Sequence, residues 1–245
     1  RTDEDHAGRV LEFVQRMPPP APAEPARPHA PVLVVPRVFE PAFCRHLIAY
    51  YEAHDSADSG FMRERDAKTV SVLDHDFKRR RDCAIEDDEI RAAARARVKR
   101  RLVPEIAKAF NFHVTRMERY LIACYDAEPG GFFRAHRDNM TKGTAHRRFA
   151  VTINLNAEAY QGGDLCFPEY GRAMYRAPTG GAVVFGCSLL HEAQLVTRGR
   201  RYAFLPFLYD EDAAHIREAN NPHLGEGTKP YRAGDDPVGA DATTD

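Results

Sequence analysis

The sequence predicts a mainly β fold, a jelly roll with N-terminal helices packed on one of its sheets. Residues 116–210 contain short β-type segments at regular intervals with turn residues between them, a pattern typical of a sandwich or barrel. Residues 41–51 and 87–110 instead show apolar residues at helical spacing. The length of 245 residues suits one domain of jelly-roll size with helical additions.

The beginning of the chain differs in composition from the rest. Residues 5–17 place apolar side chains on one side of a helix, which predicts a short amphipathic helix. Residues 18–31 are dense in proline and alanine, a composition that favours an extended linker. We therefore expect residues 1–31 to be a short helix and a Pro-rich linker, the end of a preceding domain in a longer protein.

Residues 32–115 are expected to form the helical N-terminal part of the main domain. Val32–Val35 predicts a short strand, and Pro41 opens a helix, a position where proline is well tolerated. Residues 55–85 are polar and irregular, and within them the stretch 70–73 is the part that resembles a strand.

A second, longer helical pattern follows. Asp87 and Asp88 precede it, and it runs to Phe110. Acidic residues at the start of a helix complement the helix dipole. Pro104 lies inside the pattern and should kink the helix, because proline removes a backbone hydrogen bond.

The jelly-roll core is expected over residues 116–210, so that the main domain spans residues 32–210. The predicted strands are 117–125, 131–136, 147–156, 163–167, 172–176, 181–186, 189–196 and 201–209. The chain then becomes polar, and residues 211–245 are expected to be a polar C-terminal tail. About 25 residues at its end should be disordered or loosely attached.

Bulk properties exclude several classes of protein. The net charge of −1 gives no general attraction to nucleic acid or to an anionic membrane. The five cysteines include no CxxC pair, which argues against a disulfide framework or a zinc ribbon and favours a reducing compartment. No apolar run is long enough to predict a membrane span. These features predict a cytoplasmic protein with no membrane partner.

A possible metal site stands out within the β-rich region. His136 and Asp138 are two positions apart, so that both side chains lie on one face of a strand or its end. His191 follows on a later predicted strand. Two imidazoles and one carboxylate form the facial triad that holds iron(II) and leaves positions open for other ligands. Arg201, ten positions beyond His191, suits bidentate binding of a carboxylate deep in the barrel.

The region from Tyr120 to Asp210 resembles the prolyl-4-hydroxylase-like 2-oxoglutarate/Fe(II)-dependent dioxygenase family, in its bacterial form. The matching pieces are Ala123-Cys124-Tyr125, Gly130-Gly131-Phe132, His136-Arg137-Asp138-Asn139, Arg148 to Thr152, Leu155-Asn156, Gly162 to Leu165, Phe167-Pro168, Gly181 to Phe185, His191-Glu192 and Arg201-Tyr202-Ala203. The family fold is a double-stranded β-helix, which is a jelly roll with helices packed on one sheet. The resemblance identifies residues 32–210 as an oxygenase domain.

The resemblance implies roles for the matching residues. The metal ligands would be His136, Asp138 and His191. The distal carboxylate of 2-oxoglutarate would bind Arg201, with help from the hydroxyl of Tyr125. A further contact to this cosubstrate would come from Asn154, which lies where relatives often place a polar or aromatic residue.

The implied activity is hydroxylation of an unactivated C–H bond in a peptide, an amino acid or a small metabolite, with release of succinate and CO2. The implied cofactors are Fe(II) and 2-oxoglutarate, with ascorbate as a candidate reductant. Because Asp138 is present, hydroxylation is favoured over halogenation. The expected partner is a small-molecule or peptide substrate, and no nucleic acid is expected.

Two alternatives remain open. The chain could be an oxygenase-fold sensor or binding module within a larger redox protein, or a zinc hydrolase that uses the same three ligands. The zinc hydrolase offers no use for Arg201, and a pure binding module has no need for both a metal site and 2-oxoglutarate groups. Asp74-His75-Asp76 is a weak candidate for a second metal site, because successive side chains on a strand point to opposite faces.

The segment 56–85 carries many cations and is expected to form part of a lid over the active site. Arg79, Arg80 and Arg81 are its densest run. If some of these cations face the mouth, an anionic substrate follows. The alternative is that residues 56–85 form a solvated loop with no role in binding.

Overall fold

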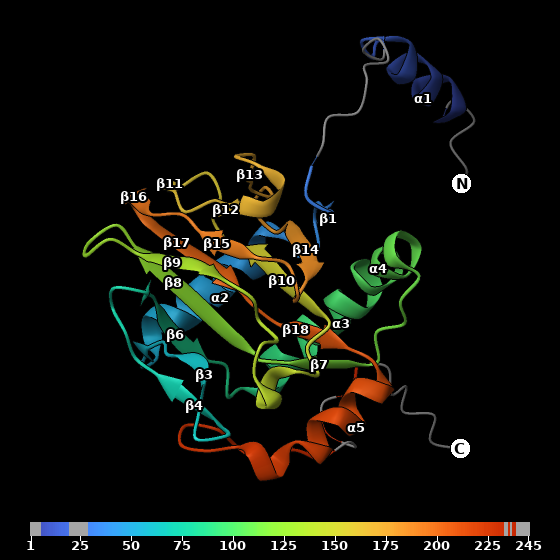
Figure 1. The fold of residues 1–245 in the computed structure, drawn as a ribbon. Coiled ribbons are helices and arrows are strands. Elements are labelled where there is room, and N and C mark those ends of the chain that lie inside the picture. Colours follow the sequence, from blue (N-terminus) through green and yellow to red (C-terminus); the bar gives the residue numbers. More distant parts are fainter. Residues whose placement is uncertain (1–5, 20–28, 233–234, 236, 239–245) are drawn as a thin grey trace.

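The computed structural model describes residues 6–19, 29–232, 235 and 237–238. A larger and a smaller antiparallel sheet face each other, and helices from the first half of the chain cover the outer face of the larger sheet (Figure 1). The predicted jelly roll with N-terminal helices on one sheet is therefore confirmed.

The larger sheet contains the long central strands. Its order is β1-β14-β10-β17-β8-β6-β2, with β18 paired to β10 and β7 paired to β18. The bounds are β1 (Val32–Val35), β2 (Ala57–Asp58), β6 (Arg81–Ala84), β7 (Arg116–Glu118), β8 (Leu121–Asp126), β10 (Phe149–Asn154), β14 (Ala182–Gly186), β17 (Arg200–Phe204) and β18 (Phe207–Tyr209).

The smaller sheet has the order β13-β12-β15-β9-β5. Its strands are β5 (Lys78–Arg79), β9 (Phe132–His136), β12 (Leu165–Cys166), β13 (Met174–Tyr175) and β15 (His191–Ala193). Separate two-stranded pairs are β3 (Phe61–Arg65) with β4 (Lys68–Val72), and β11 (Gln161–Gly162) with β16 (Val196–Arg198).

Strand alternation divides the core into two layers. On β10, Val151 and Ile153 pack towards the helices, whereas Ala150 packs towards the smaller sheet. The inner layer between the sheets also contains Tyr125 and Phe133. The candidate site lies in this inner layer, between the two sheets.

The helices are α1 (His6–Gln15), α2 (Pro41–Ala53), α3 (Asp88–Arg101), α4 (Val103–Phe110) and α5 (Glu211–Ala219), with 3-10 turns at Lys142–Thr144, Pro168–Tyr170 and Asn221–His223. The carboxylate of Asp87 caps α3 by accepting from the Ile90 amide. The long helix expected to kink at Pro104 is instead divided at Leu102 into α3 and α4, and Pro104 occupies the first turn of α4, where proline is well tolerated. In the described part of the chain, no helix is both long and apolar enough to cross a membrane.

Several local predictions need correction. The predicted strand 117–125 is interrupted because Arg119 adopts a left-handed φ of 69°. The predicted strand 201–209 divides into β17 and β18 at Leu205 and Pro206. Residues 55–85 are more ordered than expected and contain β2 to β6. Residues of β2, β3, β5 and β6 line the cavity, and these short strands are largely polar, so their hydrophobic pattern is weak.

The described part of the C-terminal region is attached to the domain, which corrects the expectation of a loose end. The Gly225 amide donates to the Thr69 carbonyl at 2.9 Å, and the Ser71 amide donates to the Glu226 carbonyl at 3.1 Å. Tyr231 is buried. Residues 233–234, 236 and 239–245 lie outside the described residues.

The predicted helix at residues 5–17 is confirmed by α1, in which no described residue is buried. Most of the predicted Pro-rich linker, residues 20–28, lies outside the described residues. Its end is packed on the domain, because Ala30 is buried and its amide donates to the Tyr175 hydroxyl at 2.9 Å.

Candidate metal centre

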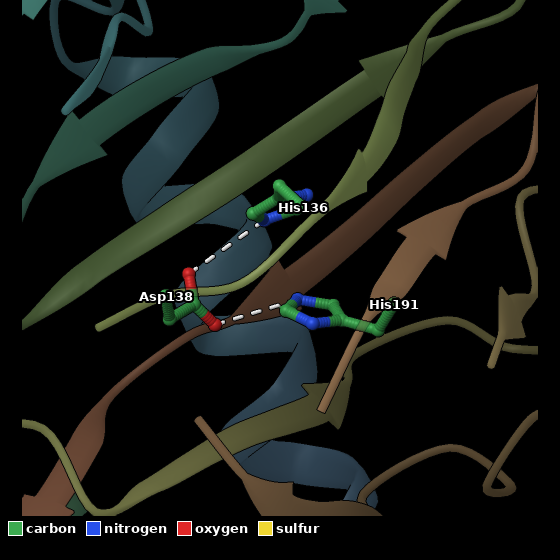
Figure 2. Close-up of side chains that lie close together, drawn as sticks. All are labelled: His136, Asp138 and His191. Atoms are coloured by element: carbon green, nitrogen blue, oxygen red, sulfur yellow. Dashed lines mark ion pairs between the residues drawn. The ribbon is translucent and has the colours of Figure 1, made fainter. Parts of the chain in front are cut away.

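The three predicted ligands meet in space. His136 ends β9, Asp138 follows two residues later, and His191 begins β15. Strands β9 and β15 are neighbours, and His191 lies opposite His136 in their register. Figure 2 shows both imidazoles directed at the Asp138 carboxylate. The pairing of β9 with β15 therefore brings together two histidines that lie far apart in the sequence.

The distances fit ligands that share one ion. Asp138 Oδ1 lies 3.6 Å from His136 Nε2, and Asp138 Oδ2 lies 3.3 Å from His191 Nε2. One ligand atom from each residue falls within 4.8 Å of the other two. Adjacent ligands of an octahedral ion, each bonded at about 2.1 Å, lie about 3 Å apart. A small inward shift of side chains would therefore complete the coordination.

Backbone carbonyls orient both imidazoles. His136 Nδ1 lies 2.7 Å from the Arg134 carbonyl, and His191 Nδ1 lies 3.0 Å from the Leu189 carbonyl. A carbonyl can only accept, so each Nδ1 carries the proton. The Nε2 lone pairs are then free to bind a metal, which is the arrangement that outer hydrogen bonds impose on ligand histidines.

Electrostatics keep the ligands in the protonation states that metal binding needs. Burial acts to raise the pKa of Asp138, but the neighbouring His191 and His136 outweigh burial and hold that pKa well below its usual value. Burial lowers the pKa of His191 to about 4. At neutral pH the site therefore offers a carboxylate and an uncharged buried imidazole.

Aromatic rings and a backbone contact hold the ligands in place. Phe133 stacks on His136 with ring centres 3.5 Å apart, and the Phe185 ring centre lies 4.5 Å from that of His191. The Asp138 amide donates to the Cys187 carbonyl at 3.0 Å. This packing limits rotation of the ligands and keeps water from their apolar side.

A cavity of about 820 Å³ opens from the triad. Arg201 lines it and is only 2% exposed, yet its Nε and Nη1 find no hydrogen-bond partner among the described residues. Tyr125 lines the cavity beside it. A buried guanidinium without acceptors is costly unless a ligand supplies them. These unpaired donors fit a carboxylate such as the distal one of 2-oxoglutarate.

Strand alternation separates Arg201 from its neighbour Arg200, as the sequence predicts. The Arg200 side chain is on the outer face and pairs with Asp126 at 2.7 Å. The cavity therefore receives one arginine from this strand.

The structure places Asn154 differently from the other predicted contacts. Its side chain is buried and donates to the Ala177 carbonyl at 2.7 Å. The cavity is lined instead by Thr152, two residues earlier on the same face of β10. A role for Asn154 in cosubstrate binding stays a prediction.

The basic run in the expected lid splits between inside and outside. Arg80 lines the cavity, together with Lys78, whereas Arg79 and Arg81 line a separate hollow. Arg80 is buried and pairs with Asp82, which sequence reasoning missed because nothing in a polar stretch marks which carboxylate pairs with a buried cation.

The second candidate metal site is not formed. Asp74 Oδ1 accepts from the Asp76 amide at 2.9 Å in a local turn, and His75 pairs with Asp58 at 3.4 Å. Within the described ranges, the ligand group that could hold an ion is His136, Asp138 and His191.

Comparison with known proteins agrees with the site. Residues 120–209 match the 2OG-Fe(II) oxygenase superfamily. A PKHD-type hydroxylase of Synechococcus sp. strain JA-2-3B'a(2-13) is 35% identical over 89 residues, which are 34% of this chain and 39% of the relative. The chain thus matches about two fifths of the length of such curated relatives.

Solved structures share the fold. A prolyl-4-hydroxylase of Pseudomonas putida superposes with a TM-score of 0.57 at 18% identity, covering 74% of this chain and 94% of that one. The epimerase SnoN from nogalamycin biosynthesis, described as non-haem and α-ketoglutarate dependent, has a TM-score of 0.56 at 15% identity. It covers 88% of this chain and 94% of its own.

The superfamily is named for two groups, and the residues fit both. The His136, Asp138 and His191 donor set is the one that holds iron(II) with open positions. The unpaired buried guanidinium of Arg201 fits 2-oxoglutarate. Residues 120–209 are thus similar in sequence and in donor set to the 2OG-Fe(II) oxygenase superfamily, and the chain shares its fold with a prolyl-4-hydroxylase.

Proposed function

We propose that this chain is a 2-oxoglutarate- and Fe(II)-dependent dioxygenase that hydroxylates an unactivated C–H bond of a peptide, an amino acid or a small metabolite, with release of succinate and CO2. The observation that carries the proposal is the shared cavity of the triad and Arg201. A pure binding module has no need for both a three-ligand metal site and a buried cation with unpaired donors.

Each residue has a defined task in this proposal. His136, Asp138 and His191 hold the metal on one face and leave the opposite face for other ligands. Arg201 binds the distal carboxylate of 2-oxoglutarate, and Tyr125 donates its hydroxyl to the same molecule. Bound iron supplies the activation of dioxygen. The protein contributes orientation and a water-poor environment.

The cavity has room for a substrate beside the cosubstrate. Its volume of about 820 Å³ lies within the usual range for small-molecule sites. Phe61, Phe77 and Phe133 contribute apolar surface near the triad. Residues 32–210 are proposed to form the oxygenase domain.

The test is a spectroscopic titration. Apo-protein is loaded anaerobically with Fe(II) and then with 2-oxoglutarate, and the visible charge-transfer band of a metal-chelated keto acid is followed. The band should appear in the wild type, disappear in His136→Ala and weaken strongly in Arg201→Ala. Arg200→Ala is the matched control, because Arg200 lies on the outer face of the same strand, and it should keep the band.

The outcomes separate the competing functions. Folded, iron-loaded protein without a band would exclude 2-oxoglutarate as cosubstrate and favour the sensor or zinc hydrolase interpretations. A band without any succinate formation across a substrate library would favour a sensor that binds the cosubstrate only.

A further inference from the structure

Three cations and one carboxylate cluster on a wall of the cavity. Lys78, Arg80, Asp82 and Arg119 all line it. Arg80 holds Asp82 through two hydrogen bonds, Nε to Oδ1 at 2.7 Å and Nη2 to Oδ2 at 2.6 Å. Arg119 Nη2 lies 3.5 Å from Asp82 Oδ2. One carboxylate therefore serves more than one cation.

The chain path explains how these side chains meet. Lys78 belongs to β5 in the smaller sheet, whereas β6 begins at Arg81 in the larger sheet. The chain thus crosses between the sheets at Arg80 and closes one edge of the barrel. Lys78 reaches the cavity from the smaller sheet and Arg80 from the crossing itself, whereas Arg79 and Arg81 face away from the cavity.

Lys78 is the cation least compensated by this arrangement. It is 5% exposed, and its ammonium group donates to Ser59 Oγ at 2.7 Å and to the Gly60 carbonyl at 2.6 Å. Both acceptors are uncharged, and an ammonium group has a third N–H. Burial, with help from the nearby Arg80 guanidinium, holds the pKa of Lys78 well below its usual value. An anion beside it would reverse that effect.

The proposed cofactors do not neutralise the positive charges of Lys78, Arg80 and Arg119. Asp138 faces the metal, and the distal carboxylate of 2-oxoglutarate is assigned to Arg201. Asp82 is the carboxylate that Lys78, Arg80 and Arg119 share. Glu118, which also lies near Arg119, already pairs with Arg147 and Arg217. Buried cations in excess are unfavourable unless a ligand pairs with them.

The position of the wall suits a substrate. The Lys78 ammonium lies 4.7 Å from the centre of the Phe133 ring, and that ring stacks on His136. A group bound at Lys78 is therefore close to the metal ligands. Phe61 and Phe77, which pack with Phe133, supply apolar surface next to the cations.

We propose that the substrate is a carboxylate with an apolar body, and that Lys78, Arg80 and Arg119 bind its carboxylate group beside the metal centre. The inference rests on the proposed function, since it assigns the substrate class of the same site. It also predicts that the matched carboxamide, which lacks the charge, binds much more weakly.

The test uses the enzyme loaded anaerobically with Fe(II) and saturating 2-oxoglutarate. The charge-transfer band first establishes that this complex has formed, so its absence would count against the proposed function and not against the substrate class. Benzoate and benzamide are then titrated by calorimetry as a charged and an uncharged probe of one shape. Benzoate should bind saturably, and benzamide at least about tenfold more weakly.

Variants locate the binding. Arg119→Gln and Lys78→Met should each weaken benzoate binding by about tenfold while keeping the band. Arg79→Gln is the matched control on β5, because Arg79 faces away from the cavity, and it should bind benzoate like the wild type. Arg119 is partly exposed, so its variant tests the inference even if Lys78→Met fails to fold.

Three results would overturn the inference. One is a loaded enzyme that shows the band but binds no benzoate. Another is equal binding of benzoate and benzamide. The last is benzoate binding that is unchanged in folded Arg119→Gln and Lys78→Met.

Discussion

The guanidinium carbon of Arg201 lies 5.0 Å from the centre of the Tyr125 ring, and the two residues are directly paired across β17 and β8. The Tyr125 hydroxyl accepts from Arg80 Nη1 at 3.3 Å, so its own proton is available to an acceptor in the cavity. The pair therefore offers a cation and a hydroxyl donor to one carboxylate.

Removal of the Tyr125 hydroxyl should weaken cosubstrate binding without abolishing it. For Tyr125→Phe we expect the Kd for 2-oxoglutarate to rise about tenfold, since one hydrogen bond to a charged group is lost. For Arg201→Met the rise should reach about 100-fold or more, because the charge and a bidentate contact are lost. Titration of the charge-transfer band measures both. Tyr202→Phe is the control, because Tyr202 lies on the helix-facing side of β17, and its Kd for 2-oxoglutarate should match that of the wild type.

Gly163 should be required for the position of Arg201. Its φ is +69°, and a Cβ there would lie 2.8 Å from Val196 Cγ2 and 3.1 Å from Arg201 Cδ. Gly163→Ala should cost about 1–3 kcal/mol of stability and weaken 2-oxoglutarate binding several-fold. Gly171→Ala has a similarly strained φ of +102° with no atom within 4 Å of the new Cβ. If Gly163→Ala and Gly171→Ala weaken 2-oxoglutarate binding equally, the contact with Arg201 is not the cause.

Asp82 should make stability depend on pH in the acid range. Burial by itself raises the pKa of Asp82, but Arg80, Lys78 and Arg119 outweigh burial and lower it from 3.8 to about 2. A depressed folded-state pKa stabilises the fold above pH 3.8, and this contribution is lost as the pH falls towards 2. Its full size is about 2 kcal/mol.

Urea unfolding at about pH 6 and about pH 2.5 measures this effect, because Asp82→Asn removes the titrating group. The variant should be less stable than the wild type at the higher pH, and the difference should narrow at the lower pH. Asp76→Asn is the control, since the Asp76 side chain is 94% exposed. A constant difference between Asp82→Asn and wild type at both pH values would contradict the assignment.

Glu118 should be among the most sensitive positions for stability. Its buried carboxylate accepts from His146 at 3.1 Å, from Arg147 at 2.8 Å and from Arg217 at 2.8 Å. Glu118→Gln removes the buried negative charge that Arg147 and Arg217 both contact, and it should cost about 3–5 kcal/mol in chemical denaturation. Glu105→Gln removes an exposed pair with Lys108 and should cost under about 1 kcal/mol.

The thiols should be protected in the native state. All five cysteines are free and buried, and burial raises the pKa of Cys44 and of Cys124 to about 11. Reaction with Ellman's reagent should therefore be slow in the folded protein and should reach five thiols per chain in denaturant. Rapid labelling of one thiol in native protein would show that this cysteine is exposed in solution.

The sequence predicted most accurately those residues whose side-chain chemistry and strand or helix period both indicate the same position. His136 and Asp138 share a strand face by the two-residue period, and Arg201 is separated from Arg200 by the same rule. The acidic cap of α3 also acts locally, so its effect follows from the sequence alone.

The parts that could not be predicted depend on distant contacts. Which member of the basic run faces the cavity depends on the crossing between sheets at Arg80, and no local pattern shows that crossing. Asp82 looks like any surface carboxylate until Arg80 and Arg119 surround it. Asn154 has a family counterpart, but its amide is taken by the Ala177 carbonyl, a partner more than twenty residues away.

The hydrogen bonds from residues 225 and 226 to β4 also link the end of the chain to the mouth of the cavity. Strand β4 pairs along its whole length with β3, and Phe61 to Glu64 of β3 line the cavity. In Figure 1 the chain after α5 runs beneath this hairpin. A sequence change near residues 225–226 can therefore alter which molecules enter, although no atom of that segment lines the cavity. Substrate selectivity can therefore change through substitutions near residues 225–226 while the metal ligands stay the same.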